Sequence, residues 1–322
     1  MIDQLGRRIE YLRLSVTDRC NLRCVYCMPK EGAPLLPHSS LLSYEELVRV
    51  CRCASELGID RIKLTGGEPL LRRGIETLVA KLKALDGIRQ VTLTTNAILL
   101  GELAQRLADA GLDRVNISLD TLDAAQYRQI TRGGELSMVL DAILIAQKAG
   151  LALRLNCVPT PETLEQIVPL AKLAQRWPLD VRFIELMPIG AGAHWQGVFS
   201  SEVKRRLEQA YGPLHVCPQM QGNGPAEYAS LEGFLGKIGF ISAFSSCFCA
   251  RCNRVRLTAT GFLRLCLQYE DGVDLRELLR SGADDEQLIQ AMRGAIVQKP
   301  AHHRFGEMLP QANRRGMSQI GG

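Results

Sequence analysis

The sequence predicts an α/β protein whose parallel sheet carries its helices on the outside. Short runs rich in β-branched and aliphatic residues alternate with amphipathic helical patterns, six times in succession. No hairpin signal occurs among these units, so each strand returns to the sheet through a helix and neighbouring strands are parallel. The expected strands are residues 11–16, 61–65, 90–95, 114–119, 151–158 and 180–187.

The predicted helices have recognisable ends. Ser43 and Glu46 form the S-x-x-E pattern of a capping box, which predicts a helix from residue 43 to about residue 58. Further helices are expected at about residues 74–85, 102–110, 137–149 and 162–176. The alternation stops after about residue 190, and we expect a core domain over residues 1–225 and a C-terminal domain over residues 226–322.

Composition and charge limit the classes of protein to consider. The chain has 322 residues, of which 46% are hydrophobic and 23% charged, enough for one large core or two smaller ones. It has no apolar run of about 18 residues, and its N-terminus is charged where a signal peptide would be apolar, so we expect a cytoplasmic protein without membrane contact. The net charge of +5 is too mild to indicate nucleic acid, and it suits an anionic small molecule.

Three cysteines lie close together directly after the first predicted strand. Cys20, Cys24 and Cys27 stand in the segment DRCNLRCVYCMPK, with Asp18 and His38 as distant candidates for a fourth ligand. A structural zinc site needs four ligands, whereas an iron-sulfur cluster bound by three cysteines leaves one iron free to bind another molecule. The carboxyl end of a parallel strand is also where ligands gather in such folds. The pattern therefore favours an iron-sulfur cluster.

A second cysteine group lies in the C-terminal part of the chain. Cys249, Cys252 and Cys266 form a natural set of three, and Cys247 could make it four. On spacing alone a zinc ribbon competes with an iron-sulfur cluster here. If the stretch is extended, one intervening residue turns the side chains of Cys247 and Cys249 to opposite faces, so we expect Cys247 not to be a ligand.

Several basic residues interrupt apolar strand patterns. Arg13, Lys63 and Arg154 each lie inside such a strand, where an unpaired charge would be costly. Guanidinium groups match phosphate oxygens in bidentate fashion, so these unusual positions are compatible with an anionic ligand.

The motifs together resemble those of a known family. Three cysteines spaced in this way, Tyr26 just before the last of them and GGEP at residues 66–69 resemble the radical S-adenosylmethionine (SAM) enzymes. With the second cysteine group, the NRVR that follows it and the Gly-Gly end, the chain is similar over its length to the GTP 3′,8-cyclase family of molybdenum cofactor biosynthesis. This resemblance implies a partial (β/α)6 TIM-like barrel with a C-terminal domain that carries a second cluster.

The resemblance also implies an activity. Members of the family are lyases that hold two [4Fe-4S] clusters and S-adenosyl-L-methionine. Through a 5′-deoxyadenosyl radical they convert GTP into (8S)-3′,8-cyclo-7,8-dihydroguanosine 5′-triphosphate. The implied partners are a cyclic pyranopterin monophosphate synthase, a reductant such as flavodoxin or ferredoxin, and a second copy in a homodimer.

Site residues follow from the motif match. The implied ligands are Cys20, Cys24 and Cys27 for the first cluster, and Cys249, Cys252 and Cys266 for the second. SAM is expected at Tyr26, Gly67, Ser118 and Met187, and GTP at Arg13, Lys63, Thr94, Arg154, Arg254 and Arg256. Catalytic roles are implied for Arg13, Arg254, Arg256, Gly321 and Gly322. A glycine at position 67 also makes physical sense, because backbone without a side chain can approach the methionyl group closely.

Two other hypotheses stay open on the sequence. A different radical enzyme with an auxiliary cluster, acting for instance on a peptide, would not need Arg254, Arg256 and the Gly-Gly end. A zinc-binding nucleic-acid protein would show tetrahedral zinc sites and binding that depends strongly on salt.

Overall fold

The computed structural model describes residues 1–218, 224–305 and 316–320. Within them a single sheet of twelve strands has the order β12-β11-β10-β1-β2-β3-β4-β5-β6-β9-β8-β7. The strands are Tyr11–Ser15 (β1), Arg61–Thr65 (β2), Gln90–Thr95 (β3), Arg114–Ser118 (β4), Leu153–Cys157 (β5), Asp180–Ile184 (β6), His215–Cys217 (β7), Glu227–Ser230 (β8), Ile238–Ile241 (β9), Arg254–Leu257 (β10), Phe262–Arg264 (β11) and Gly272–Asp274 (β12).

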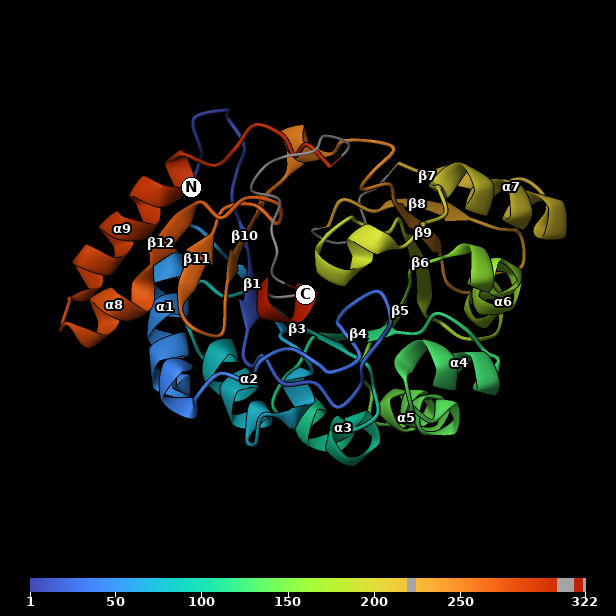
Figure 1. Ribbon diagram of the computed structural model, residues 1–322, viewed down its shortest axis with the longest axis horizontal. Helices are drawn as coiled ribbons and strands as arrows, with labels where there is room; N and C mark the ends of the chain where they lie inside the picture. The colour runs from blue at the N-terminus through green and yellow to red at the C-terminus, as the bar shows by residue number, and fades with distance from the viewer. Residues whose placement is uncertain (219–223, 306–315, 321–322) are drawn as a thin grey trace.

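The helices lie on the outside of this curved sheet (Figure 1). They are Tyr44–Glu56 (α1), Ile75–Lys83 (α2), Leu100–Asp109 (α3), Ala124–Thr131 (α4), Leu136–Lys148 (α5), Ile167–Arg176 (α6), Ser200–Tyr211 (α7), Leu275–Arg280 (α8), Asp285–Val297 (α9) and Met317–Ile320 (α10). The short helix α10 is the exception, because it lies inside the arc of strands (Figure 1).

The strands from β1 to β6 are parallel, as the sequence predicts. The C-terminal half of the chain extends both ends of this parallel core. The strand β10 pairs parallel to β1, and β9 pairs parallel to β6, while β11, β12, β8 and β7 continue the sheet in antiparallel fashion. Because the two edge strands, β12 and β7, do not pair with each other, the described strands form an open barrel.

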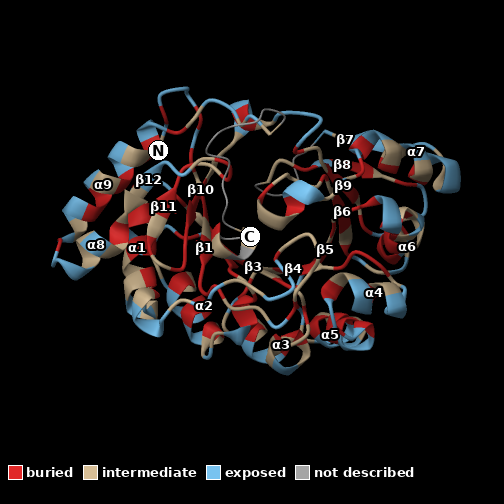
Figure 2. Ribbon diagram, in the orientation of Figure 1, coloured by how far each residue is buried: buried red, intermediate tan, exposed pale blue. Residues whose placement is uncertain are grey.

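The core lies between the sheet and its outer helices, where the strands are largely buried (Figure 2). The capping box of α1 forms as predicted: the Ser43 hydroxyl accepts from the Glu46 N–H, and the Glu46 carboxylate accepts from the Ser43 N–H. Cys51 and Cys53 of α1 are buried among its apolar residues. The α/β class, the parallel sheet and the six strand positions are confirmed, whereas the domain boundary near residue 225 stays a prediction.

Candidate active site

Two glycines lie where the first cysteine-bearing loop crosses the end of β2. The N–H of Gly67 donates to the carbonyl of Thr17 (2.9 Å), and the N–H of Glu68 donates to the carbonyl of Arg19 (2.7 Å). A Cβ at Gly66, whose φ is +153°, would lie 2.5 Å from the Thr17 oxygen, and a Cβ at Gly67 would overlap the Arg19 carbonyl. The close approach at both glycines is therefore to the protein's own loop, which the GGEP motif holds against the sheet.

Replacement of Gly67 by alanine tests this packing. The added methyl group has no space beside the Arg19 backbone, so we expect the loop to shift and stability to fall by about 1–3 kcal/mol, as in overpacked cores. The iron retained by the first cysteine group should fall as well. Gly294→Ala is the matched control, because its methyl group meets nothing within 4 Å in α9. Equal thermal unfolding of the two variants would contradict the assignment.

The carboxylate of Glu68 joins the ends of β2 and β3 beneath this loop. It accepts hydrogen bonds from the N–H of Leu70 (3.0 Å), the hydroxyl of Thr95 (2.7 Å) and the N–H of Asn96 (2.7 Å). Burial raises the pKa of Glu68 to about 7. The Asn96 amide in turn lies 3.9 Å from the sulfur of Cys20, so the strand ends position the first cysteine.

The three N-terminal cysteines are half-buried thiols that lie close to one another. Burial raises the pKa of Cys20, and burial together with its neighbour Cys27 raises the pKa of Cys24 well above its usual value. The Cys27 N–H donates to the Cys24 carbonyl (2.9 Å), which folds the loop back on itself. None of the three forms a disulfide. A soft metal centre that displaces the thiol protons fits this group.

Tyr26, between the second and third cysteines, is held by a residue just beyond the end of β4. Its hydroxyl is hydrogen-bonded to the carboxylate of Asp120, which also accepts from the N–H of Val158 (2.8 Å). Burial raises the pKa of Asp120 to about 6. Ser118, another residue implied for SAM, is the last residue of β4. The predicted residues Tyr26 and Ser118 are thus brought to the same strand end as the cysteine loop.

Basic side chains fill the interior of the barrel at the level of the mid-strand. Arg13 on β1 is in register with Arg256 on β10 and with Lys63 on β2. Burial, and then the neighbouring Arg182 and Arg13, lower the pKa of Lys63 well below its usual value. Burial also lowers the pKa of Arg13 to about 10, and burial with Arg13 lowers that of Arg256. Lys63 forms no ion pair with any residue that the structure describes.

Arg182 on β6 belongs to this group, although it was not among the predicted site residues. Its guanidinium donates to the side-chain oxygens of Asn116 (2.8 Å) and Asn156 (2.6 Å), and burial lowers its pKa to about 10. Arg182 interrupts an apolar strand just as Lys63 does, so the same signal could have identified it. Neutral amides orient this arginine without cancelling its charge.

The remaining predicted substrate residues lie on the same strands. Arg154 on β5 is paired with Asp180 at 2.8 Å and lies over the ring of Tyr228. Thr94 is on β3, in register with Asn116 of β4. Basic side chains from several neighbouring strands therefore lie together in the barrel interior, which favours an anionic ligand there.

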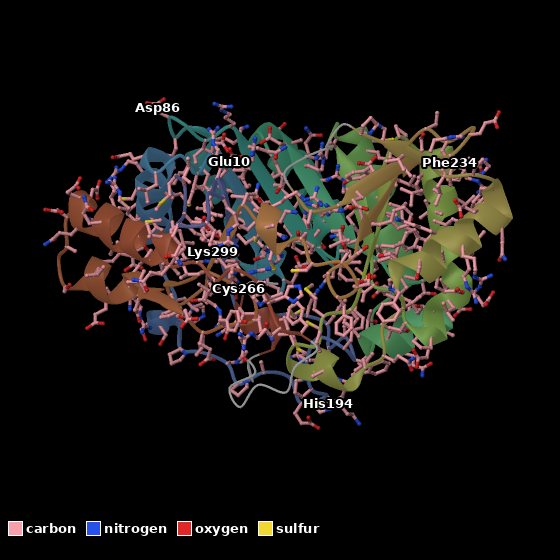
Figure 3. The ribbon with its side chains drawn as sticks, turned by 90° about the horizontal axis from the view of Figure 1, so that it is seen from above. Glu10, Asp86, His194, Phe234, Cys266 and Lys299 are labelled. Atoms are coloured by element: carbon pink, nitrogen blue, oxygen red, sulfur yellow. The ribbon has the colours of Figure 1, made fainter. Side chains whose placement is uncertain are left out.

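The second cysteine group lies at the opposite end of the strands. Cys249 and Cys252 precede β10, which is parallel to β1, and Cys266 follows the antiparallel β11, whereas the N-terminal cysteines follow β1. Burial alone would raise the pKa of Cys252, but Arg254 and Lys299 lower it to about 7. Lys299 lies beside Cys266 (Figure 3). The basic interior thus lies between the two cysteine groups along the strand direction.

Backbone contacts hold the loop of this second group. Arg7 donates to the carbonyls of Cys249 (3.1 Å), Lys299 (2.9 Å) and Ala301 (3.3 Å), and its Nε is paired with Asp3 at 2.6 Å. This buried arginine ties the N-terminal segment to both segments that border the cysteines. The sequence offered no signal for Arg7 beyond its charge.

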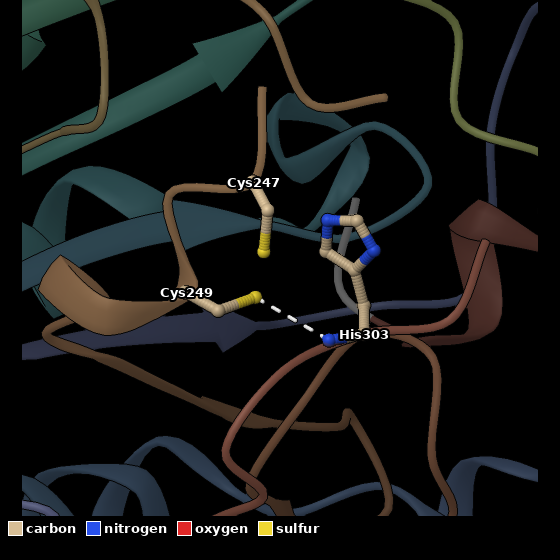
Figure 4. Close-up of side chains that lie close together, drawn as sticks. All are labelled: Cys247, Cys249 and His303. Carbon is tan, nitrogen blue, oxygen red and sulfur yellow. Dashed lines mark hydrogen bonds between the residues drawn. The ribbon is translucent and has the colours of Figure 1, made fainter. Parts of the chain in front are cut away.

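The extended geometry considered for Cys247 is not observed, whereas the expectation that Cys247 is not a ligand of the second cluster stays a prediction. Cys247 and Cys249 do not point to opposite faces, because their sulfurs lie within 4.8 Å of each other and of a His303 nitrogen (Figure 4). The reason is that the chain is not extended here: Phe248 has φ −93° and ψ 14°, and Cys249 begins a 3₁₀ turn, Cys249–Arg251. A tight turn places alternate side chains on one side.

The C-terminal helix α10 reaches the same interior. Ile320 is fully buried and packs with Ile189 and Leu267, against which Met187 also packs. Met187 is a predicted SAM residue, and Leu267 directly follows Cys266. The predicted catalytic residues Gly321 and Gly322 lie outside the described residues.

Comparisons with known proteins agree with this arrangement. Residues 14–174 match the Radical SAM superfamily, and residues 179–305 match Molybdenum Cofactor Synthesis C. The GTP 3′,8-cyclase of Moorella thermoacetica is 47% identical over 326 residues, and that of Clostridium perfringens 42% over 323 residues, each covering 100% of both chains. The chain belongs to the GTP 3′,8-cyclase family. Radical SAM enzymes of this kind use a [4Fe-4S] cluster and S-adenosylmethionine, which fits the first cysteine group.

Solved structures support the fold. The structure of Streptococcus suis SuiB bound to S-adenosylmethionine aligns with a TM-score of 0.63 at 17% identity, over 90% of this chain and 68% of that chain. At this identity the likeness concerns the fold, which the GTP 3′,8-cyclase family shares with other radical SAM enzymes. None of the helices in the described parts of the chain has both the length and the apolar character needed to cross a membrane.

Proposed function

We propose that this chain converts GTP into (8S)-3′,8-cyclo-7,8-dihydroguanosine 5′-triphosphate, with the residues below in defined roles. Family membership at 42–47% identity over the full length supports the reaction. The observation that carries the site is the group of buried cations that lies between two groups of three cysteines. A barrel with this charge is suited to a small polyanion, and a nucleoside triphosphate is one.

Cys20, Cys24 and Cys27 would hold the first [4Fe-4S] cluster. When bound, this cluster and SAM supply the one-electron chemistry by which a hydrogen atom is removed from the ribose. The loop is kept in place by the GGEP segment and by Glu68, whose contacts fix the ends of β2 and β3. The protein's part at this end is to orient SAM at the strand ends of Gly67, Ser118 and Met187 and to exclude water.

The basic residues would bind the triphosphate. Three basic side chains approach one another inside the barrel: those of Lys63, Arg13 and Arg182. An anion that enters would reduce their mutual repulsion and the free-energy cost of burying their charges. Arg154 and Thr94 lie on the next strands and would complete the contacts. This arrangement fixes the ribose with respect to both ends of the barrel, which is the main requirement of a reaction on one C–H bond.

Cys249, Cys252 and Cys266 would hold a second [4Fe-4S] cluster, with one iron left for the guanine base. The pKa of about 7 at Cys252, set by Arg254 and Lys299 against burial, favours a thiolate there. Arg254 and Arg256 would face the substrate from β10. Gly321 and Gly322 are proposed to act from the chain end, since Ile320 packs beside Leu267 and Ile189.

Incubation of the anaerobically purified full chain with GTP, SAM and a reductant tests the proposal. We expect 5′-deoxyadenosine and the cyclised nucleotide to form together, as measured by liquid chromatography and mass spectrometry. Formation of 5′-deoxyadenosine with GTP recovered unchanged would contradict the choice of substrate while leaving a radical enzyme. We further propose a flavodoxin or ferredoxin as electron donor, a cyclic pyranopterin monophosphate synthase as the next enzyme, and a homodimer.

A further inference from the structure

A compact group of metal-ligating side chains lies beside the second cysteine group. The sulfurs of Cys247 and Cys249 and a ring nitrogen of His303 lie within 4.8 Å of one another (Figure 4). The His303 backbone N–H donates to the Cys249 sulfur at 3.4 Å, and its ring is stacked on Phe305 with centroids 4.2 Å apart. Among the described residues, no other three His, Cys, Asp or Glu side chains come this close together.

The imidazole of His303 is an independent sign of a missing ligand. Both of its ring nitrogens are buried, and among the described residues neither forms a hydrogen bond of ordinary geometry, although the ring interacts with the backbone of Ala243. A buried polar nitrogen without a partner loses its hydration and gains nothing in return, so such groups are rare unless something else binds them. A metal ion on one nitrogen would supply that interaction.

The spacing fits one ion. Zn²⁺ binds thiolate sulfur at about 2.3 Å and imidazole nitrogen at about 2.0–2.1 Å, so ligand atoms around one tetrahedral ion lie about 3.5–4 Å apart. The three atoms here need only a small adjustment to reach this distance. Cys247 is exposed, which gives an ion a path from solvent and leaves a fourth position for water.

We propose that Cys247, Cys249 and His303 bind a single Zn²⁺ when the second iron-sulfur cluster is absent. Binding breaks two S–H bonds and forms two Zn–S bonds and one Zn–N bond, and the two protons leave to solvent. Cys249 is also one of the three cysteines assigned to the second cluster. The ion and that cluster therefore exclude one another, a consequence that rests on the proposed function.

Titration of the cluster-free full chain with Zn²⁺ alone, against a chelating dye, tests the site. The substitutions Cys20→Ser, Cys24→Ser and Cys27→Ser provide the background, because they remove the other thiol group. We expect one Zn²⁺ per chain, and at least tenfold weaker binding after Cys247→Ser or His303→Ala. His302→Ala is the control for the neighbouring exposed imidazole and should change affinity less than twofold.

Two results would overturn the site. One is the absence of stoichiometric Zn²⁺ binding in this background. The other is weak binding after Cys252→Ser or Cys266→Ser together with unchanged binding after Cys247→Ser and His303→Ala, which would assign the ion to the cluster cysteines. Circular dichroism of each variant shows whether its fold is intact.

A reconstitution experiment tests the exclusion separately. The unsubstituted chain is given iron and sulfide with or without prior Zn²⁺. We expect about eight irons per chain without zinc and about four after it, while Cys247→Ser reaches about eight in both cases. Equal iron with and without zinc in the unsubstituted chain overturns the exclusion. About four irons in every sample would instead contradict the second cluster, and thereby the proposed function.

Discussion

We expect Cys24→Ala to lower cleavage of SAM by more than about a thousandfold, since the loss of one of the three proposed ligands would remove the first cluster. Cys24 is the middle cysteine of the loop, its carbonyl accepts the Cys27 N–H, and its pKa is raised by burial and by Cys27. Burial disfavours the thiolate form of these cysteines. A bound metal centre would make the thiolate form favourable. The measurement is 5′-deoxyadenosine formed by the reduced, anaerobic protein, together with iron per chain.

Cys51→Ala is the matched control for this substitution. Cys51 is a buried cysteine of α1 within the apolar core, so it should retain both iron and cleavage. If Cys24→Ala keeps its iron and still cleaves SAM, the first cysteine group is not the site of the radical chemistry. If Cys51→Ala also lost its iron and SAM cleavage, the effect of Cys24→Ala would be explained by lower protein stability and not by the loss of a cluster ligand.

Arg256→Ala separates substrate binding from SAM cleavage. The Arg256 side chain is buried beside Arg13, and burial together with this like charge lowers its pKa. A bound phosphate or nucleotide base would therefore stabilise the charged form of Arg256. Loss of a charge-assisted hydrogen-bonding group costs about 2–4 kcal/mol, which predicts a fall in GTP cyclisation of roughly thirtyfold to a thousandfold. Uncoupled formation of 5′-deoxyadenosine should persist.

The ratio of cyclised nucleotide to 5′-deoxyadenosine is the informative quantity for this variant. Arg256→Lys should recover part of the ratio, because it restores the charge but not the bidentate geometry. Arg89→Ala, whose side chain is 78% exposed, should leave the ratio unchanged. An unchanged ratio in Arg256→Ala would remove this arginine from the substrate site.

The parallel core could be predicted because its strands and helices carry strong periodic signals. The six strands β1 to β6 each bury an apolar run, and the capping box of α1 lies at Ser43 as expected. The helix α4 was missed, since its buried residues are only Tyr127 and Thr131 and leave almost no apolar stripe. The strands β7 and β10 to β12 have three or four residues, too few for a period to be recognised.

The candidate site was predictable where a local rule applies and not where distant segments meet. Charged residues inside apolar strands singled out Arg13 and Lys63, whose pKa values are lowered by burial, and the same rule would have singled out Arg182. The position of His303 beside Cys249 depends on how a loop 54 residues away in sequence returns to the barrel, so spacing could not reveal it. The turn at Phe248 likewise brings the side chain of Cys247 to the same side as that of Cys249, whereas an extended stretch would separate them.

We propose that the second cysteine group holds a cluster with one position open to the substrate. The most direct measurement is the electron paramagnetic resonance spectrum of the reduced protein carrying Cys20→Ser, Cys24→Ser and Cys27→Ser, recorded with and without GTP. We predict an iron-sulfur signal that GTP changes and that ATP at the same concentration does not. A signal that GTP leaves unchanged, or zinc in place of iron, would contradict it.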